Sequence, residues 1–224
     1  MLKKFIKDIF RYLNLLIVFR TYREFIRQKK APLETPWGFV LAGNMEMAIG
    51  KYESNETRLV RSLLPNVDIL INVGANVGYY CCHALSLNKK VIAFEPLPRN
   101  LHFLNQNINR NNWGDSAEVF PVALAESSGI VELYGDDTGA SLIKGWADAS
   151  EDYVYLAPVN TLDRMLGDSI ENLRAIILVD IEGSELSMLR RAIRTLESVV
   201  RPIWIMEIVN WQNQPTGVTF NPDF

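Results

Sequence analysis

The 224-residue sequence has few cysteines, no bilayer-length apolar run in its basic N-terminal segment, and no overall excess of positive charge. Its two cysteines, Cys81 and Cys82, are adjacent, a spacing that disfavours a mutual disulfide and does not match a Cys-x-x-Cys zinc motif. The longest charge-free stretch near the N-terminus, Tyr12 to Phe19, is too short to span a bilayer, which needs about 20 apolar residues. A net charge of −3 disfavours a general nucleic-acid binder. We therefore expect a cytoplasmic, reduced, globular protein with no nucleic-acid partner.

The charge is unevenly distributed along the chain. Residues 1–30 contain nine Lys and Arg against Asp8 and Glu24, a net charge of +7, which leaves −10 for residues 31–224. Apolar residues recur in this segment at helical spacing, so we expect a basic amphipathic helical arm over residues 1–30. Such an arm suits peripheral contact with an anionic membrane, and it equally suits packing against its own domain. Both interpretations stay open at this point.

The rest of the sequence predicts an α/β domain. Residues 31–52 are rich in Pro and Gly and are expected to form a linker with short extended pieces, so the domain is placed at residues 53–224. Near-continuous apolar runs alternate with helical patterns, which predicts a mostly parallel sheet covered on both faces. The expected strands are 67–73, 91–94, 119–124, 130–134, 175–179 and 203–209, and the expected helices are 55–64, 77–87, 98–109 and 185–196.

A glycine-containing loop follows the first of these strands. Gly74 and Gly78 flank Asn76 where the strand turns into a helix, so the backbone can approach a ligand there. Glu95 ends the next strand and can accept hydrogen bonds from both hydroxyls of a ribose. An NAD(P) site is the alternative, but its fingerprint requires glycine at the position of Asn76. The loop and Glu95 therefore favour S-adenosylmethionine, which carries no phosphate.

A group of carboxylates follows the strand over residues 175–179. Asp180, Glu182 and Glu185 lie within six residues, and Glu207 ends the next strand. The cluster suits a general base for a hydroxyl acceptor, and its oxygen ligands also suit a divalent cation. The structural alternative is that Glu185 caps a helix start while Asp180 orders the loop. No residue is assigned as a metal ligand, and no Ser-His-Asp or P-loop arrangement is present.

In order along the chain, these motifs resemble the FkbM-type family of class I S-adenosylmethionine-dependent methyltransferases. The resemblance covers about residues 50 to 213 and implies O-methylation of a hydroxyl on a sugar, polyketide or other small acceptor. It also implies a cofactor-binding set and a catalytic set. The matching segments are Asn72–Tyr80, Ala93–Pro96, Pro121–Leu124, Thr161–Asp163, Asp180–Glu185 and Arg201–Glu207; the cofactor set is Asn72, Gly74, Asn76, Gly78, Glu95 and Asp180, and the catalytic set is Asp180, Glu182 and Glu207.

Two features depart from the family pattern. Asn72 stands where the family usually has Asp, so the charge attraction to the amino group of the cofactor is lost. Leu178 stands where a lysine is common. A non-catalytic, membrane-associated binding module is therefore an alternative to the enzyme, as is an NAD(P)-dependent oxidoreductase.

The C-terminal end predicts a shortened sheet. The expected fold is a three-layer αβα Rossmann-like sheet that lacks the final strand pair, because only fifteen residues follow Val209 and three of them are Pro215, Gly217 and Pro222. A C-terminally truncated domain of this kind leaves an apolar edge at residues 203–209. We expect the N-terminal arm, or a second subunit of a homo-oligomer, to cover that edge.

Overall fold

Five parallel strands form the central sheet of the computed structural model, which describes residues 22, 31–135, 139–146 and 154–208. The strand order is β10-β9-β3-β4-β5. Each strand is four or five residues long, and β3 and β9 at the centre are buried along their whole length. The strands are β3 (Ile69–Val73), β4 (Lys90–Phe94), β5 (Ala117–Phe120), β9 (Ala175–Val179) and β10 (Ile203–Met206).

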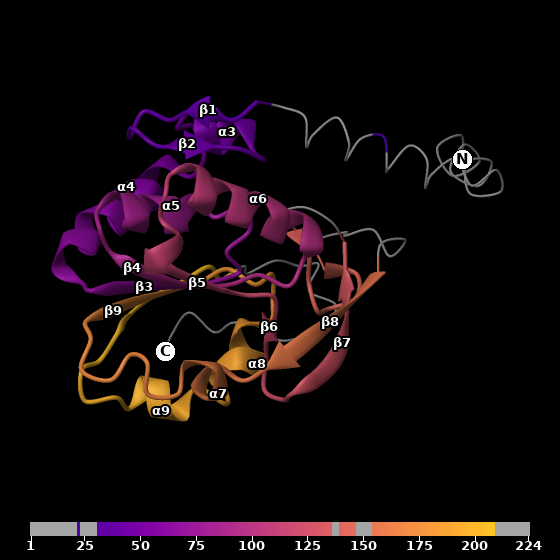
Figure 1. Ribbon diagram of the computed structural model, residues 1–224. Helices are drawn as coiled ribbons and strands as arrows, with labels where there is room; N and C mark the ends of the chain where they lie inside the picture. The colour runs from indigo at the N-terminus through magenta and orange to yellow at the C-terminus, as the bar shows by residue number, and fades with distance from the viewer. Residues whose placement is uncertain (1–21, 23–30, 136–138, 147–153, 209–224) are drawn as a thin grey trace.

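Helices cover both faces of this sheet, as Figure 1 shows. One layer contains α4 (Ser54–Leu63), α5 (Tyr79–Ser86) and α6 (Pro98–Arg110), and the other contains α7 (Leu162–Leu166), α8 (Glu185–Leu189) and α9 (Ile193–Leu196). Two apolar clusters fill the spaces between the sheet and these layers. Short 3₁₀ turns lie at Leu64–Asn66 and Gly114–Ser116. The predicted α/β class with a mostly parallel, doubly covered sheet is confirmed.

Residues 31–52 pack against the domain more closely than the expected linker would. They contain a small antiparallel pair, β1 (Leu33–Glu34) and β2 (Val40–Leu41), and the helix α3 (Met45–Ala48). Figure 1 shows this segment on the side of α5 and α6 that faces away from the sheet, and Phe39 and Leu41 are almost fully buried there. Asn107 of α6 binds the segment directly: its Oδ1 accepts from the Ala42 N–H at 2.8 Å, and its Nδ2 donates to the carbonyls of Ala42 and Val77 at 3.1 and 2.8 Å.

The predicted strand over residues 119–124 is wrong, because the chain changes sheets in its middle. Pro121 has no N–H to continue the ladder, and β5 ends at Phe120. Beyond it, β6 (Ala123–Leu124) joins a second sheet with β7 (Gly129–Tyr134) and β8 (Val154–Asn160) in the order β6-β8-β7. The sequence pattern predicts no strand at β8, where Pro158 interrupts the apolar run and pairs opposite Ile130.

The helix predicted over residues 185–196 is also divided. α8 ends at Leu189 and α9 begins at Ile193. The Asp163 carboxylate accepts hydrogen bonds from the backbone N–H groups of Arg194 and Thr195, at 2.8 and 3.0 Å, and from the Thr195 hydroxyl at 2.7 Å. These donors include N–H groups of the first turn of α9, so Asp163 stabilises a new helix start.

Several expectations lie outside the described residues. The amphipathic arm falls almost entirely within residues 1–21 and 23–30, and any strand pair after β10 would involve residues 209–224. Covering of the β10 edge by the arm or a second subunit therefore stays a prediction. Within the described ranges, no helix has the length and apolar character needed to cross a bilayer.

Candidate active site

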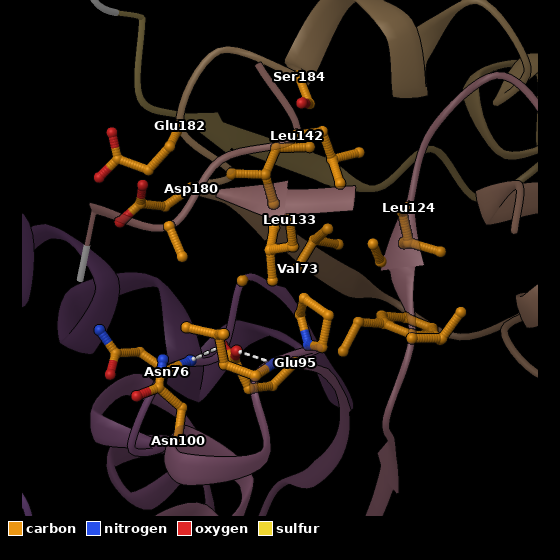
Figure 2. Close-up of a pocket in the computed structure, with 18 residues that line it drawn as sticks. Val73, Asn76, Glu95, Asn100, Leu124, Leu133, Leu142, Asp180, Glu182 and Ser184 are labelled. Carbon is orange, nitrogen blue, oxygen red and sulfur yellow. Dashed lines mark hydrogen bonds between the residues drawn. The ribbon is translucent and has the colours of Figure 1, made fainter. Parts of the chain in front are cut away.

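A cavity opens at the carboxyl ends of β3, β4 and β9, where ligands of open α/β sheets bind. Its empty volume is about 570 Å³. Figure 2 shows Glu95, Asn76 and Asn100 on one wall and Asp180 with Glu182 on the opposite wall. Leu133 and Leu142 reach the cavity from β7 and from the segment 139–146. The structure thus brings together residues from five separate parts of the sequence: 73–76, 94–100, 122–124, 133–142 and 180–184.

The loop after β3 needs glycine at both predicted positions. Gly74 has φ +83°, and a Cβ there would lie 1.8 Å from the backbone oxygen of Asp180. Gly78 has φ +85°, and a Cβ there would lie 2.5 Å from Leu104 Cδ1. The loop closes on β4 because the N–H groups of Gly74 and Ala75 both donate to the Phe94 carbonyl at 3.0 Å. Glycine is required at both positions because of the left-handed backbone and the close neighbours, and not to make the loop flexible.

Asn76 stands at the apex of this loop in the left-handed conformation, with φ +51°. Asparagine tolerates this region better than most residues because its short side chain bonds locally. Here Asn76 Oδ1 accepts from the Val77 N–H at 2.8 Å, and the Asn76 N–H donates to Glu95 Oε2 at 2.7 Å. The second of these bonds couples the loop to the acid at the end of β4.

Glu95 is a buried carboxylate on the floor of the cavity. Besides Asn76, the backbone N–H of Leu97 donates to it, at 2.9 Å from Oε1. Burial raises the pKa of Glu95 to about 7, although the hydrogen bonds from Leu97 and Asn76 act in the opposite direction. Each carboxylate oxygen has two lone pairs, so capacity remains to accept hydroxyl donors of a ligand.

Two members of the predicted cofactor set, Asn72 and Gly78, do not line the cavity. Gly78 packs against Leu104, and Asn72 lies within the covered strand β3. Its side chain points from β3 toward α5, where Nδ2 contacts Cys81 Sγ at 3.4 Å. Its Oδ1 is buried and has no hydrogen-bond partner within the described part of the chain. Cys81 and Cys82 are themselves free, buried thiols, as the sequence led us to expect.

The predicted catalytic carboxylates meet at the end of β9. Asp180, Glu182 and Glu207 each present one oxygen, and these three oxygens lie within 4.8 Å of one another. Burial and the neighbouring Glu207 hold the pKa of Asp180 well above its usual range, and burial also raises the pKa of Glu182. Asp180 therefore retains its proton at neutral pH, unless a cation takes its place.

Glu185 has a different position from the other three acids. Its Oε1 accepts from the N–H groups of Ile181 and Gly183, both at 3.2 Å. These contacts fix the turn between β9 and α8, which matches the structural alternative considered for Glu185. The turn carries two left-handed residues, Glu182 at φ +52° and Gly183 at φ +94°.

A tryptophan that the sequence motifs do not include holds this turn in place. Trp146 is 4% exposed, and its Nε1 donates to Glu182 Oε2 at 2.9 Å. Its ring lies against Gly183, where a Cβ would come within 2.5 Å of the ring. Ser141 adds a bond from its hydroxyl to the Glu182 carbonyl at 2.6 Å. The signal for Trp146 in the sequence is a large aromatic residue within a segment otherwise rich in Gly, Asp, Ser and Ala.

A second cavity lies beside the first, with Asp180 in the lining of both. Its empty volume is about 720 Å³, and α4, α5, β9 and β10 supply its walls. Glu53, immediately before α4, accepts a hydrogen bond from the Tyr80 hydroxyl at 2.6 Å. Glu56 and Glu207 complete its polar lining. Asp180 is thus the residue that the walls of the two cavities share.

Sequence and structure comparisons give matches to methyltransferases. A family described as the Methyltransferase FkbM domain matches residues 72–220. The hexuronic acid methyltransferase AglP of Haloferax volcanii is 27% identical over 149 residues, which cover 66% of this chain and 59% of that protein. The chain therefore spans less than two thirds of the length of this relative.

Two solved structures have partial similarity to the chain. Methyltransferase FkbM from Methylobacillus flagellatus is 23% identical, with a TM-score of 0.41 over 58% of this chain and 30% of that one. The methyltransferase PaMTH1 from Podospora anserina, solved with SAH bound, is 8% identical, with a TM-score of 0.41 over 70% of this chain and 56% of that one.

Proposed function

Because this chain belongs to the FkbM methyltransferase family, we propose that it binds S-adenosylmethionine in the first cavity and methylates a hydroxyl group of a small acceptor. The observation that carries the proposal is the convergence of the Gly74–Gly78 loop, Glu95 and Asp180 on one cavity. The curated relative is named for a hexuronic acid, and from it we take a sugar as the acceptor class but not the carboxylate that a hexuronic acid carries. S-adenosylmethionine supplies a methyl group already activated on a sulfonium.

The residues of the first cavity fit such a cofactor. The backbone of the loop lies close to Asp180 at Gly74 and close to Leu104 at Gly78, and a side chain at either glycine would collide with that neighbour. Glu95 is oriented by two backbone N–H groups and by a side-chain hydrogen bond from Asn100, and it retains acceptor capacity for a ribose hydroxyl. Leu97, Leu124 and Leu133 supply apolar surface for a flat base. An NAD(P) pyrophosphate fits less well, because Asn76 occupies the place of the second glycine of that fingerprint.

Asp180 is the residue to which we assign proton transfer. It lines both cavities, so its carboxyl group can face the acceptor hydroxyl and the methyl donor at once. Because its pKa is raised to about 9, the ionised form of Asp180 is a stronger base toward an alcohol than an ordinary carboxylate, and the fraction in that form increases with pH. Glu182 and Glu207 tune that pKa through their charges. Much of the remaining acceleration would come from holding the acceptor oxygen in line with the methyl group.

Calorimetry with S-adenosylhomocysteine and with NAD⁺ tests the cofactor. We expect binding of S-adenosylhomocysteine and none of NAD⁺. Glu95→Gln should weaken S-adenosylhomocysteine binding, whereas Glu118→Gln, at an exposed acid on β5, should leave the affinity unchanged. Binding of NAD⁺ in preference to S-adenosylhomocysteine, or equal effects of the two variants, would contradict the assignment.

Transfer of a labelled methyl group to a panel of hydroxylated acceptors tests the reaction. We expect the label on an oxygen of at least one acceptor and almost none with the Asp180→Asn variant. If the protein binds S-adenosylhomocysteine but methylates nothing in the panel, the non-catalytic binding module becomes the better description.

A further inference from the structure

The second cavity carries information about the acceptor, because it is open to solvent and meets the first cavity at Asp180. In the proposed function, the methyl donor fills the first cavity. The acceptor must then approach from a side where it can reach Asp180 without displacing the donor. Among the described residues, the walls supplied by α4, α5, β9 and β10 offer that approach.

The polar groups that line this second cavity are acidic or phenolic. Glu53, Glu56, Asp180 and Glu207 contribute carboxyl groups, and Tyr80 contributes a hydroxyl that already donates to Glu53. No Lys or Arg lies among the described residues that line either cavity. The remaining lining is the apolar surface of Val60 and of β9 and β10.

The neighbouring sequence has the same sign of charge. Residues 135–153 contain five acidic residues and a single cation, Lys144. Residues 209–224, which follow β10, contain Asp223 and no Lys or Arg.

The chemistry of these side chains selects for hydrogen-bond donors. Carboxylates such as Glu53, Glu56 and Glu207 accept hydrogen bonds, so they favour a ligand that presents hydroxyl or ammonium groups, whereas Asp180 retains its proton near neutral pH. A ligand carboxylate would instead meet these acids with no Lys or Arg among the described residues of the cavity lining to offset their charge. We propose that the second cavity takes an uncharged or amine-bearing polyol as the methyl acceptor and rejects carboxylated acceptors; this inference rests on the proposed function above.

Three matched probes separate the charge of the acceptor from its shape: methyl α-glucopyranoside, its 2-amino-2-deoxy counterpart and its 6-carboxylate. Saturation-transfer NMR on the full-length protein, with and without S-adenosylhomocysteine, ranks their binding. We expect signals from the neutral and amino probes and at least roughly tenfold weaker binding of the carboxylate. Equal or tighter binding of the carboxylate overturns the proposal, and so does binding of none of the three.

A charge-reversal pair locates the effect within the molecule. Glu56 is exposed on the cavity rim in α4, and Glu171 is exposed near the amino end of β9, at the opposite edge of the sheet. Glu56→Lys should strengthen binding of the carboxylate probe about tenfold relative to the neutral probe. The Glu171→Lys control should change neither. Equal effects of the two substitutions would show that net charge, and not the cavity, controls selection.

Failure of this inference can be distinguished from failure of the proposed function. If the proposed function is wrong, calorimetry will show no binding of S-adenosylhomocysteine, whichever of the three probes binds most tightly. An incorrect acceptor class would appear as normal S-adenosylhomocysteine binding together with uptake of the carboxylate probe.

Discussion

Protonation of Glu95 should control the affinity of the protein for its cofactor near neutral pH. The ribose hydroxyls of the proposed cofactor donate hydrogen bonds, so they require the ionised carboxylate. Burial raises the pKa of this group to about 7 in the free protein, so a large fraction of the protein holds the unfavourable form at pH 6 to 7. Affinity should therefore rise with pH, and binding should in turn lower the pKa of Glu95.

The size of the effect follows from that pKa. If only the ionised form binds, the apparent dissociation constant exceeds its limiting value by about 1.1-fold at pH 8 and about 11-fold at pH 6. The dissociation constant of S-adenosylhomocysteine should thus increase about tenfold from pH 8 to pH 6. This change corresponds to roughly 1.4 kcal/mol, well within the range of calorimetry.

The assay compares wild type with Glu95→Gln. Calorimetry gives the dissociation constant of S-adenosylhomocysteine for each protein in quarter-unit steps from pH 5.5 to 8.5. Glutamine does not titrate, so the variant should bind more weakly at pH 8 and show a flat profile. Any titration of the ligand itself is common to both proteins and cancels in their ratio. Parallel profiles for the two proteins would refute the reasoning, because Glu95 would then not be the titrating acceptor.

Three further substitutions test other parts of the site. Asp180→Asn should reduce methyl transfer about a hundredfold or more in single-turnover assays while changing S-adenosylhomocysteine affinity by less than about threefold; an equal loss of binding would make Asp180 a cofactor ligand instead. Trp146→Phe keeps the ring against Gly183 but removes the N–H that lowers the pKa of Glu182, so Glu182 should carry less charge and raise the pKa of Asp180 less; the pH profile of methyl transfer should move to lower pH with little change in melting temperature. An unchanged profile would leave Trp146 a packing residue only. Gly74→Ala should destabilise the fold by more than about 3 kcal/mol in urea unfolding, because its Cβ meets a backbone oxygen at 1.8 Å, whereas the Gly114→Ala control has no atom closer than 3.8 Å. Similar unfolding midpoints for the two alanine variants would contradict the close approach of Gly74 to Asp180.

The parallel sheet and the outline of the cavity could be predicted from sequence because their signals are local. The runs Ile69–Val73 and Ala175–Val179 are apolar almost throughout, which is typical of strands buried on both faces. Gly74, Glu95 and Asp180 each follow such a run. Parallel strands place their carboxyl ends along one edge, so these three residues had to converge.

The features that sequence analysis missed depend on contacts between distant residues. The second sheet includes β6 because Ala123 pairs with Val159, and no local sequence pattern predicts this pairing. Trp146 reaches Glu182 across 36 residues, a contact set by how the segment 139–146 folds back on the turn after β9. The side chain of Asn72 faces Cys81 and not the cavity, because alternate residues of a strand point to opposite faces and β3 is covered on both.

The amide of Asn107 makes the opening of two distant segments a single cooperative event. It holds Ala42 of the N-terminal extension and Val77 of the loop after β3 at the same time. If residues 39–42 separate from α6, the Val77 carbonyl loses its partner, and loosening of the loop exposes the same amide group. A ligand bound by the loop at residues 74–78 should therefore slow amide hydrogen exchange at Ala42, which lines neither cavity. The rate of amide hydrogen exchange at Ala42 should therefore indicate whether the cofactor site is occupied.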